Sequence, residues 1–79
     1  MTFCVIYSLY SDGILVMQFI ADKRRIVDTV LKNEVERRIA EGENPVRFTL
    51  TVEQYPDSDR TKLYRYTEQG ELQYVRTEA

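Results

Sequence analysis

The chain has 79 residues with one cysteine and no histidine, and this length predicts a single domain, residues 1–79, with a modest core. One cysteine excludes an intrachain disulfide, and without histidine it cannot make a thiolate or imidazole zinc site, so we expect neither metal nor cofactor. Eleven basic residues against thirteen acidic ones give a net charge of −2, which argues against a general binder of nucleic acid or membrane surfaces.

The first predicted element is a β-hairpin. Residues 2–10 and 14–20 are rich in β-branched and aromatic types and flank the turn sequence Ser11-Asp12-Gly13. A two-residue Asp-Gly loop and a three-residue loop both suit this sequence. We favour the three-residue loop, which pairs Tyr10 with Ile14, because it gives one face that is wholly apolar or aromatic. That face holds Phe3, Val5, Tyr7, Leu9, Leu15, Met17, Phe19 and Ala21.

The opposite face of the predicted hairpin is also mostly apolar. Its polar side chains are Ser8 and Gln18, while Cys4 and Tyr10 are only weakly polar. A solvated face should be polar, so we expect a cover, either from the same chain or from a second subunit. The candidate self-association residues are Ile6, Tyr10, Ile14, Val16 and Ile20.

Residues 22–41 predict a helix that begins with Asp22 as N-cap and stops at Gly42. Its apolar residues recur at helical spacing, namely Ile26, Val27, Val30, Leu31, Val35 and Ile39. Glu34 and Arg38 are four residues apart, so they can pair on the helix surface.

The predicted helix begins with three basic residues, Lys23, Arg24 and Arg25. Cations are disfavoured at this positive end of the helix dipole by a few tenths of a kcal/mol each. One interpretation is a solvated charge cluster balanced by Asp22 and Asp28. The other is a partner-binding site for an acidic or phosphorylated surface.

Three further strands are predicted, near residues 46–54, 61–67 and 71–76, and in the first of them Val46, Phe48, Leu50 and Val52 should point inward. The order ββαβββ predicts an α+β domain with an antiparallel-rich sheet and one helix packed across a face. This element order resembles a β-grasp arrangement.

The last hairpin, residues 62–76, combines tyrosines with basic residues. A three-residue loop pairs Thr67 with Glu71, and one face then holds Tyr64, Tyr66, Leu72 and Tyr74, with Lys62 and Arg76 together at its open end. Such clustering favours a core or contact layer. The alternative is a weak single-stranded nucleic-acid binder, which would use Lys62, Tyr64, Arg65, Tyr66, Tyr74 and Arg76.

No catalytic set is evident, because histidine and a glycine-rich phosphate loop are both missing and Cys4 reads as a small apolar side chain. We therefore expect a non-enzymatic protein–protein interaction module that self-associates, with a homodimer as the simplest assembly. As a regulator or inhibitor it would occupy a partner's surface, as small phage-encoded or mobile-element proteins do. The sequence shows neither a signal peptide nor an apolar run long enough to span a membrane, so we expect a cytoplasmic protein.

Overall fold

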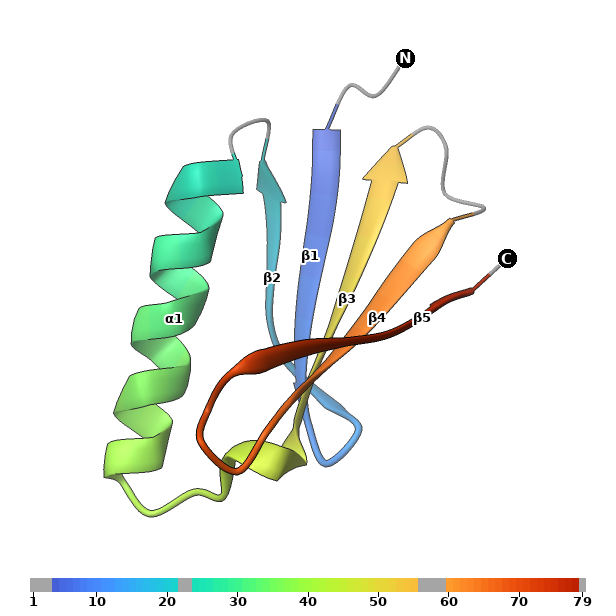
Figure 1. Cartoon of the computed structure of the whole chain (residues 1–79). Helices are drawn as coiled ribbons and strands as arrows, with labels where there is room; N and C mark the ends of the chain where they lie inside the picture. The colour runs from blue at the N-terminus through green and yellow to red at the C-terminus, as the bar shows by residue number, and fades with distance from the viewer. Residues whose placement is uncertain (1–3, 22–23, 56–59, 79) are drawn as a thin grey trace.

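The computed structural model describes residues 4–21, 24–55 and 60–78. Within these ranges the chain forms β1 (Cys4–Ser11), β2 (Ile14–Ala21), α1 (Arg24–Ala40), the short 3₁₀ helix η1 (Pro45–Arg47), β3 (Phe48–Tyr55), β4 (Thr61–Tyr66) and β5 (Leu72–Glu78) (Figure 1). The expected α+β class is confirmed. The 3₁₀ turn before β3 was not predicted.

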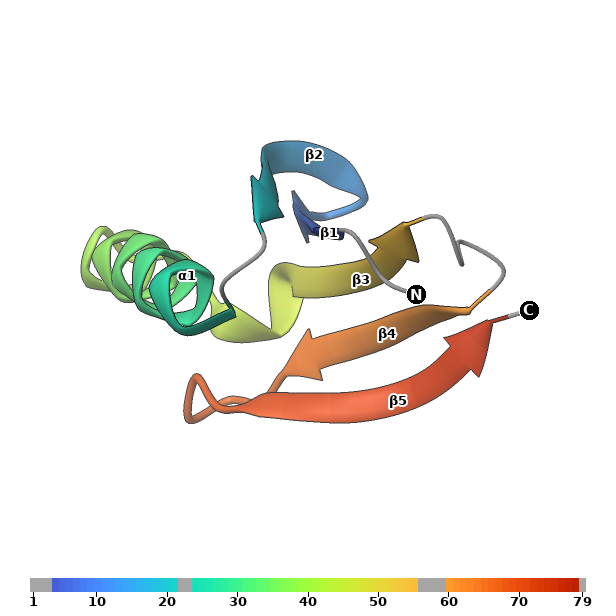
Figure 2. The ribbon, with the colours of Figure 1, turned by 90° about the horizontal axis from the view of Figure 1, so that it is seen from above.

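The described strands form one sheet in the order β2-β1-β3-β4-β5, and every neighbouring pair is antiparallel. Seen from above, the sheet runs from β2 at one edge to β5 at the other, and α1 lies to one side of it (Figure 2). The likeness to a β-grasp arrangement stays a prediction from element order.

The core lies between α1 and the facing side of the sheet. Its buried members are Tyr7, Leu9, Leu31, Val35, Phe48, Leu50 and Tyr66. Leu31 and Val35 come from the helical stripe expected of residues 22–41, and their spacing of four places them on one side of α1. The rings of Phe48 and Tyr66 meet edge to face, with centroids 6.1 Å apart.

The first residues expected in the third strand form η1 instead. Pro45 occupies its first turn, and the Asn44 side chain caps it by accepting a hydrogen bond from the Val46 amide at 3.2 Å. Val46 is therefore exposed and not inward as predicted, while Phe48 and Leu50 are buried as expected. The strand begins at Phe48 because the capped turn uses the residues before it.

The three-residue loop predicted for the first hairpin is wrong. Tyr10 pairs with Leu15, not with Ile14, so only Asp12 and Gly13 lie in the loop. Their φ angles are 50° and 79°, and a type I′ turn requires positive φ at both positions. The Asp-Gly dipeptide therefore forms the tight turn that its composition favours.

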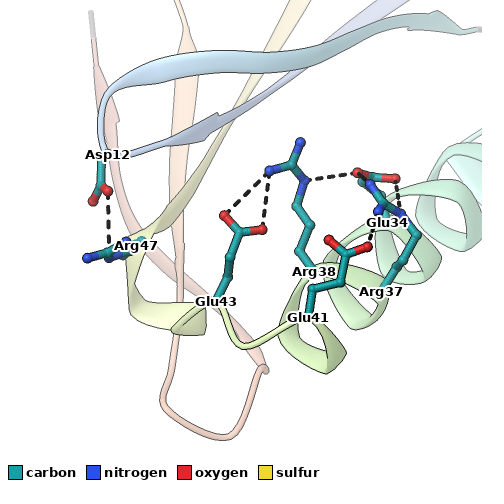
Figure 3. A network of polar contacts seen from close by, with 7 residues as sticks. All are labelled: Asp12, Glu34, Arg37, Arg38, Glu41, Glu43 and Arg47. Atoms are coloured by element: carbon teal, nitrogen blue, oxygen red, sulfur yellow. Dashed lines mark hydrogen bonds and ion pairs between the residues drawn. The ribbon is translucent and has the colours of Figure 1, made fainter.

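This turn is held against η1. The Asp12 amide donates to the Arg47 carbonyl oxygen at 3.0 Å, and the Arg47 Nε lies 3.6 Å from Asp12 Oδ2 (Figure 3). Such contacts reduce the cost of a positive φ at a residue other than glycine.

A bulge in β2 then shifts the register. Leu9 pairs with Met17, which leaves Val16 as an extra residue without a partner on β1. The inserted residue cancels the one-residue error of the predicted loop. Beyond the bulge the predicted face is therefore correct, and Tyr7 lies opposite Phe19.

The second hairpin follows the predicted register near its loop. The Thr67 amide donates to the Glu71 carbonyl at 2.8 Å, and Tyr64 pairs with Tyr74. Farther along, Val75 is an extra residue on β5, and Arg76 pairs with Leu63.

The expected meeting of Lys62 with Arg76 is therefore wrong. Lys62 pairs with Thr77 instead. The bulge moves Arg76 to the opposite face of the sheet, because one inserted residue reverses the alternation of side chains.

Candidate functional site

The face of the β1–β2 hairpin that points away from α1 is the strongest candidate surface. Tyr7 and Leu9 face the core, so the alternate residues of β1 lie on the other side. We call this surface the outer hairpin face. It consists of three cross-strand pairs, Ile6 with Ile20, Ser8 with Gln18, and Tyr10 with Leu15.

Much of the outer hairpin face is open. Ile20 is 70 % exposed and Leu15 is 49 % exposed, whereas Ile6 and Tyr10 are partly buried. In Figure 2, α1 lies on the other side of the sheet, and no described helix or strand covers this face. Exposed branched aliphatic side chains of this size are typical of a contact surface when they are grouped.

The five predicted self-association residues do not share one face in the structure. Ile6, Tyr10 and Ile20 lie on the outer hairpin face. Ile14 lies opposite Ser11, on the other side of β2, and it is 72 % exposed there. Val16 is the bulge residue and packs against the edge of the core.

Leu15 lies on the outer hairpin face, where the sequence predicts the residues on either side of it. Sequence reasoning missed it because the predicted loop reversed the alternation of side chains before the bulge. The Asp-Gly dipeptide was the available signal, since it favours a two-residue loop.

One polar pair interrupts this apolar surface. The Gln18 Nε2 donates to the Ser8 hydroxyl oxygen at 3.0 Å, and Ser8 is only 3 % exposed. Without Gln18 the hydroxyl would lack this partner in a buried position, so the Gln18 side chain satisfies the polar centre of the face.

The outer hairpin face ends at β3. Glu53, Thr51 and Thr49 lie opposite Ile6, Ser8 and Tyr10. The apolar side chains are thus confined to β1 and β2, with a polar border on the β3 side. A mainly apolar patch with a polar border is the usual composition of a protein interface.

The C-terminal half of α1 carries an ion-pair network (Figure 3). Glu34 Oε1 lies 2.6 Å from Arg37 Nη2 and 2.9 Å from Arg38 Nε. The pair with Arg38 is the one that the four-residue spacing predicts. Arg37 also pairs with Glu41 at 2.7 Å, and Arg38 with Glu43 at 3.2 Å. The two arginines therefore compensate acidic residues that the negative end of the helix dipole disfavours.

The network shifts the pKa values of its members toward their charged forms. Hydrogen bonds from Arg37 and then from Arg38 hold the pKa of Glu34 below its ordinary value. The hydrogen bond with Glu34 raises the pKa of both guanidinium groups. These paired charges stabilise a helix end and leave no poised acid or base.

The structure does not test the partner-binding site predicted at the basic start of the helix. Lys23 lies outside the described residues, and so do the side chains of Arg24 and Arg25. The proposed acidic or phosphorylated partner of these residues stays a prediction.

The predicted nucleic-acid set is divided between two faces. Tyr66 is 7 % exposed and packs on Phe48, so it offers no free ring. Tyr64 and Tyr74 meet edge to face at 5.6 Å. Arg65 lies on the opposite face, where its Nε donates to Gln73 at 3.2 Å.

Arg76 lies on the side of Arg65, and only Lys62 shares the tyrosine side. Stacking of single strands needs exposed rings with cations around them. The six residues do not form such a platform in this structure.

Sequence reasoning missed a groove between α1 and the β4–β5 hairpin. Its volume is about 410 Å³, and its lining is mainly apolar, with Leu31, Val35, Leu50, Tyr66 and Leu72 at its walls. A second hollow of about 320 Å³ adjoins it through Leu50 and Leu72. The charged side chains at the first hollow, Lys32, Glu36 and Glu71, can fix the orientation of a bound group but make no nucleophile and base pair.

No cluster of three or more His, Cys, Asp or Glu side chains within the described ranges could hold a metal ion. No helix in the same part of the chain is long and apolar enough to cross a membrane. Comparison with protein-family models, with curated proteins and with solved structures finds no match for the chain.

Proposed function

We propose that the protein is a non-enzymatic interaction module that self-associates through β2 and the outer hairpin face. One observation carries this proposal: an edge strand exposes large aliphatic side chains, led by Ile20 and Leu15, on a face that no described element covers. A chain of 79 residues has a small core, and association is one of the usual ways to stabilise such a chain.

In this proposal the assembled protein acts as a regulator or inhibitor by occupying the surface of another protein. The mixed charge of the chain favours a protein partner over bare nucleic acid. A cytoplasmic location and an origin in a phage or mobile element belong to the same proposal.

A charge placed on the contact surface tests the proposal. Ile20→Lys should convert the assembly to monomer, because a two-fold contact through β2 brings the two introduced ammonium groups close together on one face, where they repel. The matched control is Val75→Lys, which places the same side chain on the opposite edge strand, where Val75 is also exposed. We expect the control to keep the wild-type mass in light scattering after gel filtration.

Two outcomes of these measurements would contradict the proposal. If both variants keep the assembled mass, the contact does not involve the outer hairpin face. If the wild-type protein is itself a monomer at tens of micromolar, self-association is wrong.

A further inference from the structure

The outer edge of β2 is the unpaired backbone edge nearest the outer hairpin face. β2 is the last strand of the sheet on that side, and no described strand pairs with its outer edge. Figure 2 shows that α1 does not lie along this edge. Half of the backbone N–H and C=O groups of an edge strand point away from the sheet, and they form a template for another strand.

The two edges of this sheet differ in charge. β5, at the other edge, carries Arg76 and Glu78, which form an ion pair at 2.9 Å. β2, with the sequence ILVMQFIA, contains no ionisable side chain. Charged residues on an edge strand discourage pairing with further strands, so β5 is protected in a way that β2 is not.

From these observations we infer that a second copy of this chain pairs with the outer edge of β2. The strands run antiparallel about a two-fold axis, so that the two sheets become one. This inference rests on the proposed self-association and names its geometry. A two-fold contact brings the same strand against itself, and a strand without charge meets its copy without like-charge repulsion in any register.

The bulge selects the register. Val16 interrupts the strand near the turn and leaves residues 17–21 as the regular segment. Pairing this whole segment with itself places the two-fold axis at Phe19, the middle residue. Gln18 of one copy then lies opposite Ile20 of the other copy, both on the outer face, and Phe19 extends the core side across the contact.

Spin labels test this arrangement in the full-length protein. A Cys4→Ser background removes the native thiol, and single cysteines for labelling replace Ile14, Gln18 or Ile20, which are all exposed. Antiparallel pairing about Phe19 makes the offset between equivalent positions grow with distance from the axis. The backbone offset is about 7 Å for residues 18 and 20 and roughly 30 Å for residue 14, at about 3.4 Å per residue.

Strong dipolar broadening at positions 18 and 20, with a long distance at position 14, would support edge pairing. A dimer with similar distances at all three positions, or with position 14 the closest, would overturn edge pairing and leave self-association intact. A monomeric mass with no dipolar coupling at any position would overturn both.

The unlabelled wild-type protein gives a second measurement that does not depend on the variants folding. Amide hydrogen exchange in β2 should slow at least tenfold as the protein concentration rises through the association range, while exchange in the β5 edge should change little. An equal change at both edges, or none in a protein of dimer mass, would contradict pairing through β2.

Discussion

Gln18 and Ser8 form a hydrogen bond of 3.0 Å across the β1–β2 hairpin, between an exposed amide and a nearly buried hydroxyl. The pair lies between the Ile6–Ile20 and Tyr10–Leu15 pairs of the outer hairpin face. The centre of an otherwise apolar surface is therefore polar but satisfied.

Gln18→Ala should destabilise the fold by about 1–2 kcal/mol, because it leaves the Ser8 hydroxyl buried without this partner. Ser8→Ala is the matched change and should cost only about 0.5 kcal/mol, since the exposed Gln18 amide can turn to water. Urea unfolding at one protein concentration measures both free energies. A larger loss for Ser8→Ala would contradict this reading of the pair.

Gly70→Ala should be more destabilising than Gly13→Ala. Both glycines have positive φ, at 78° and 79°, so an added side chain costs about 1–2 kcal/mol of backbone strain at either site. A Cβ at Gly70 would also lie 3.3 Å from Cδ1 of Ile39, whereas nothing lies within 4 Å at Gly13. We expect an additional cost of about 0.5 kcal/mol at Gly70 in thermal unfolding, in line with mild overpacking. Equal costs would show that Ile39 moves away freely.

Glu34→Gln should lower stability at neutral pH and have less effect in acid. The pKa of Glu34 is held below its ordinary value of 4.5 in the folded protein. Its contribution is therefore complete above about pH 4.5 and is lost as the pH falls through the lowered folded-state pKa.

The measurement is the urea midpoint of wild type and variant at pH 7 and pH 3. Glu36→Gln on the same helix is the control, because Glu36 is exposed and takes no part in the network of Figure 3. A difference between wild type and Glu34→Gln that grows at pH 3 would reverse the expected sign.

We expect no saturable binding of a labelled single-stranded oligonucleotide at micromolar protein, even at low salt. The tyrosines and arginines of the last hairpin lie on opposite faces, and Tyr66 is buried. Fluorescence anisotropy measures this directly. Micromolar binding that weakens steeply with salt and disappears in Tyr74→Ala would restore the nucleic-acid alternative.

Much of the fold could be predicted from side-chain periodicity. The helical spacing of Leu31 and Val35 and the alternation of Phe48 and Leu50 each correspond to buried residues in the structure. These signals are regular over several residues, so small errors at the ends of elements do not remove them.

The bulges at Val16 and Val75 could not be predicted. Each inserts one residue within an otherwise regular strand, and valine carries no composition signal for a bulge. The bulge at Val75 explains why Arg76 was misplaced, because it moves Arg76 to the opposite face of the sheet. Leu15 was missed for another reason, since the first loop has two residues and not the predicted three. The groove was missed for a related reason, because the extent to which α1 covers the sheet depends on tertiary packing.

Sedimentation equilibrium of the wild-type protein tests self-association most directly. The chain has a mass of 9.4 kDa. We predict a mass that rises with concentration toward twice this value at tens of micromolar, and that remains at the monomer value for Ile20→Lys. A wild-type mass of 9.4 kDa at every concentration up to the high micromolar range would contradict the account.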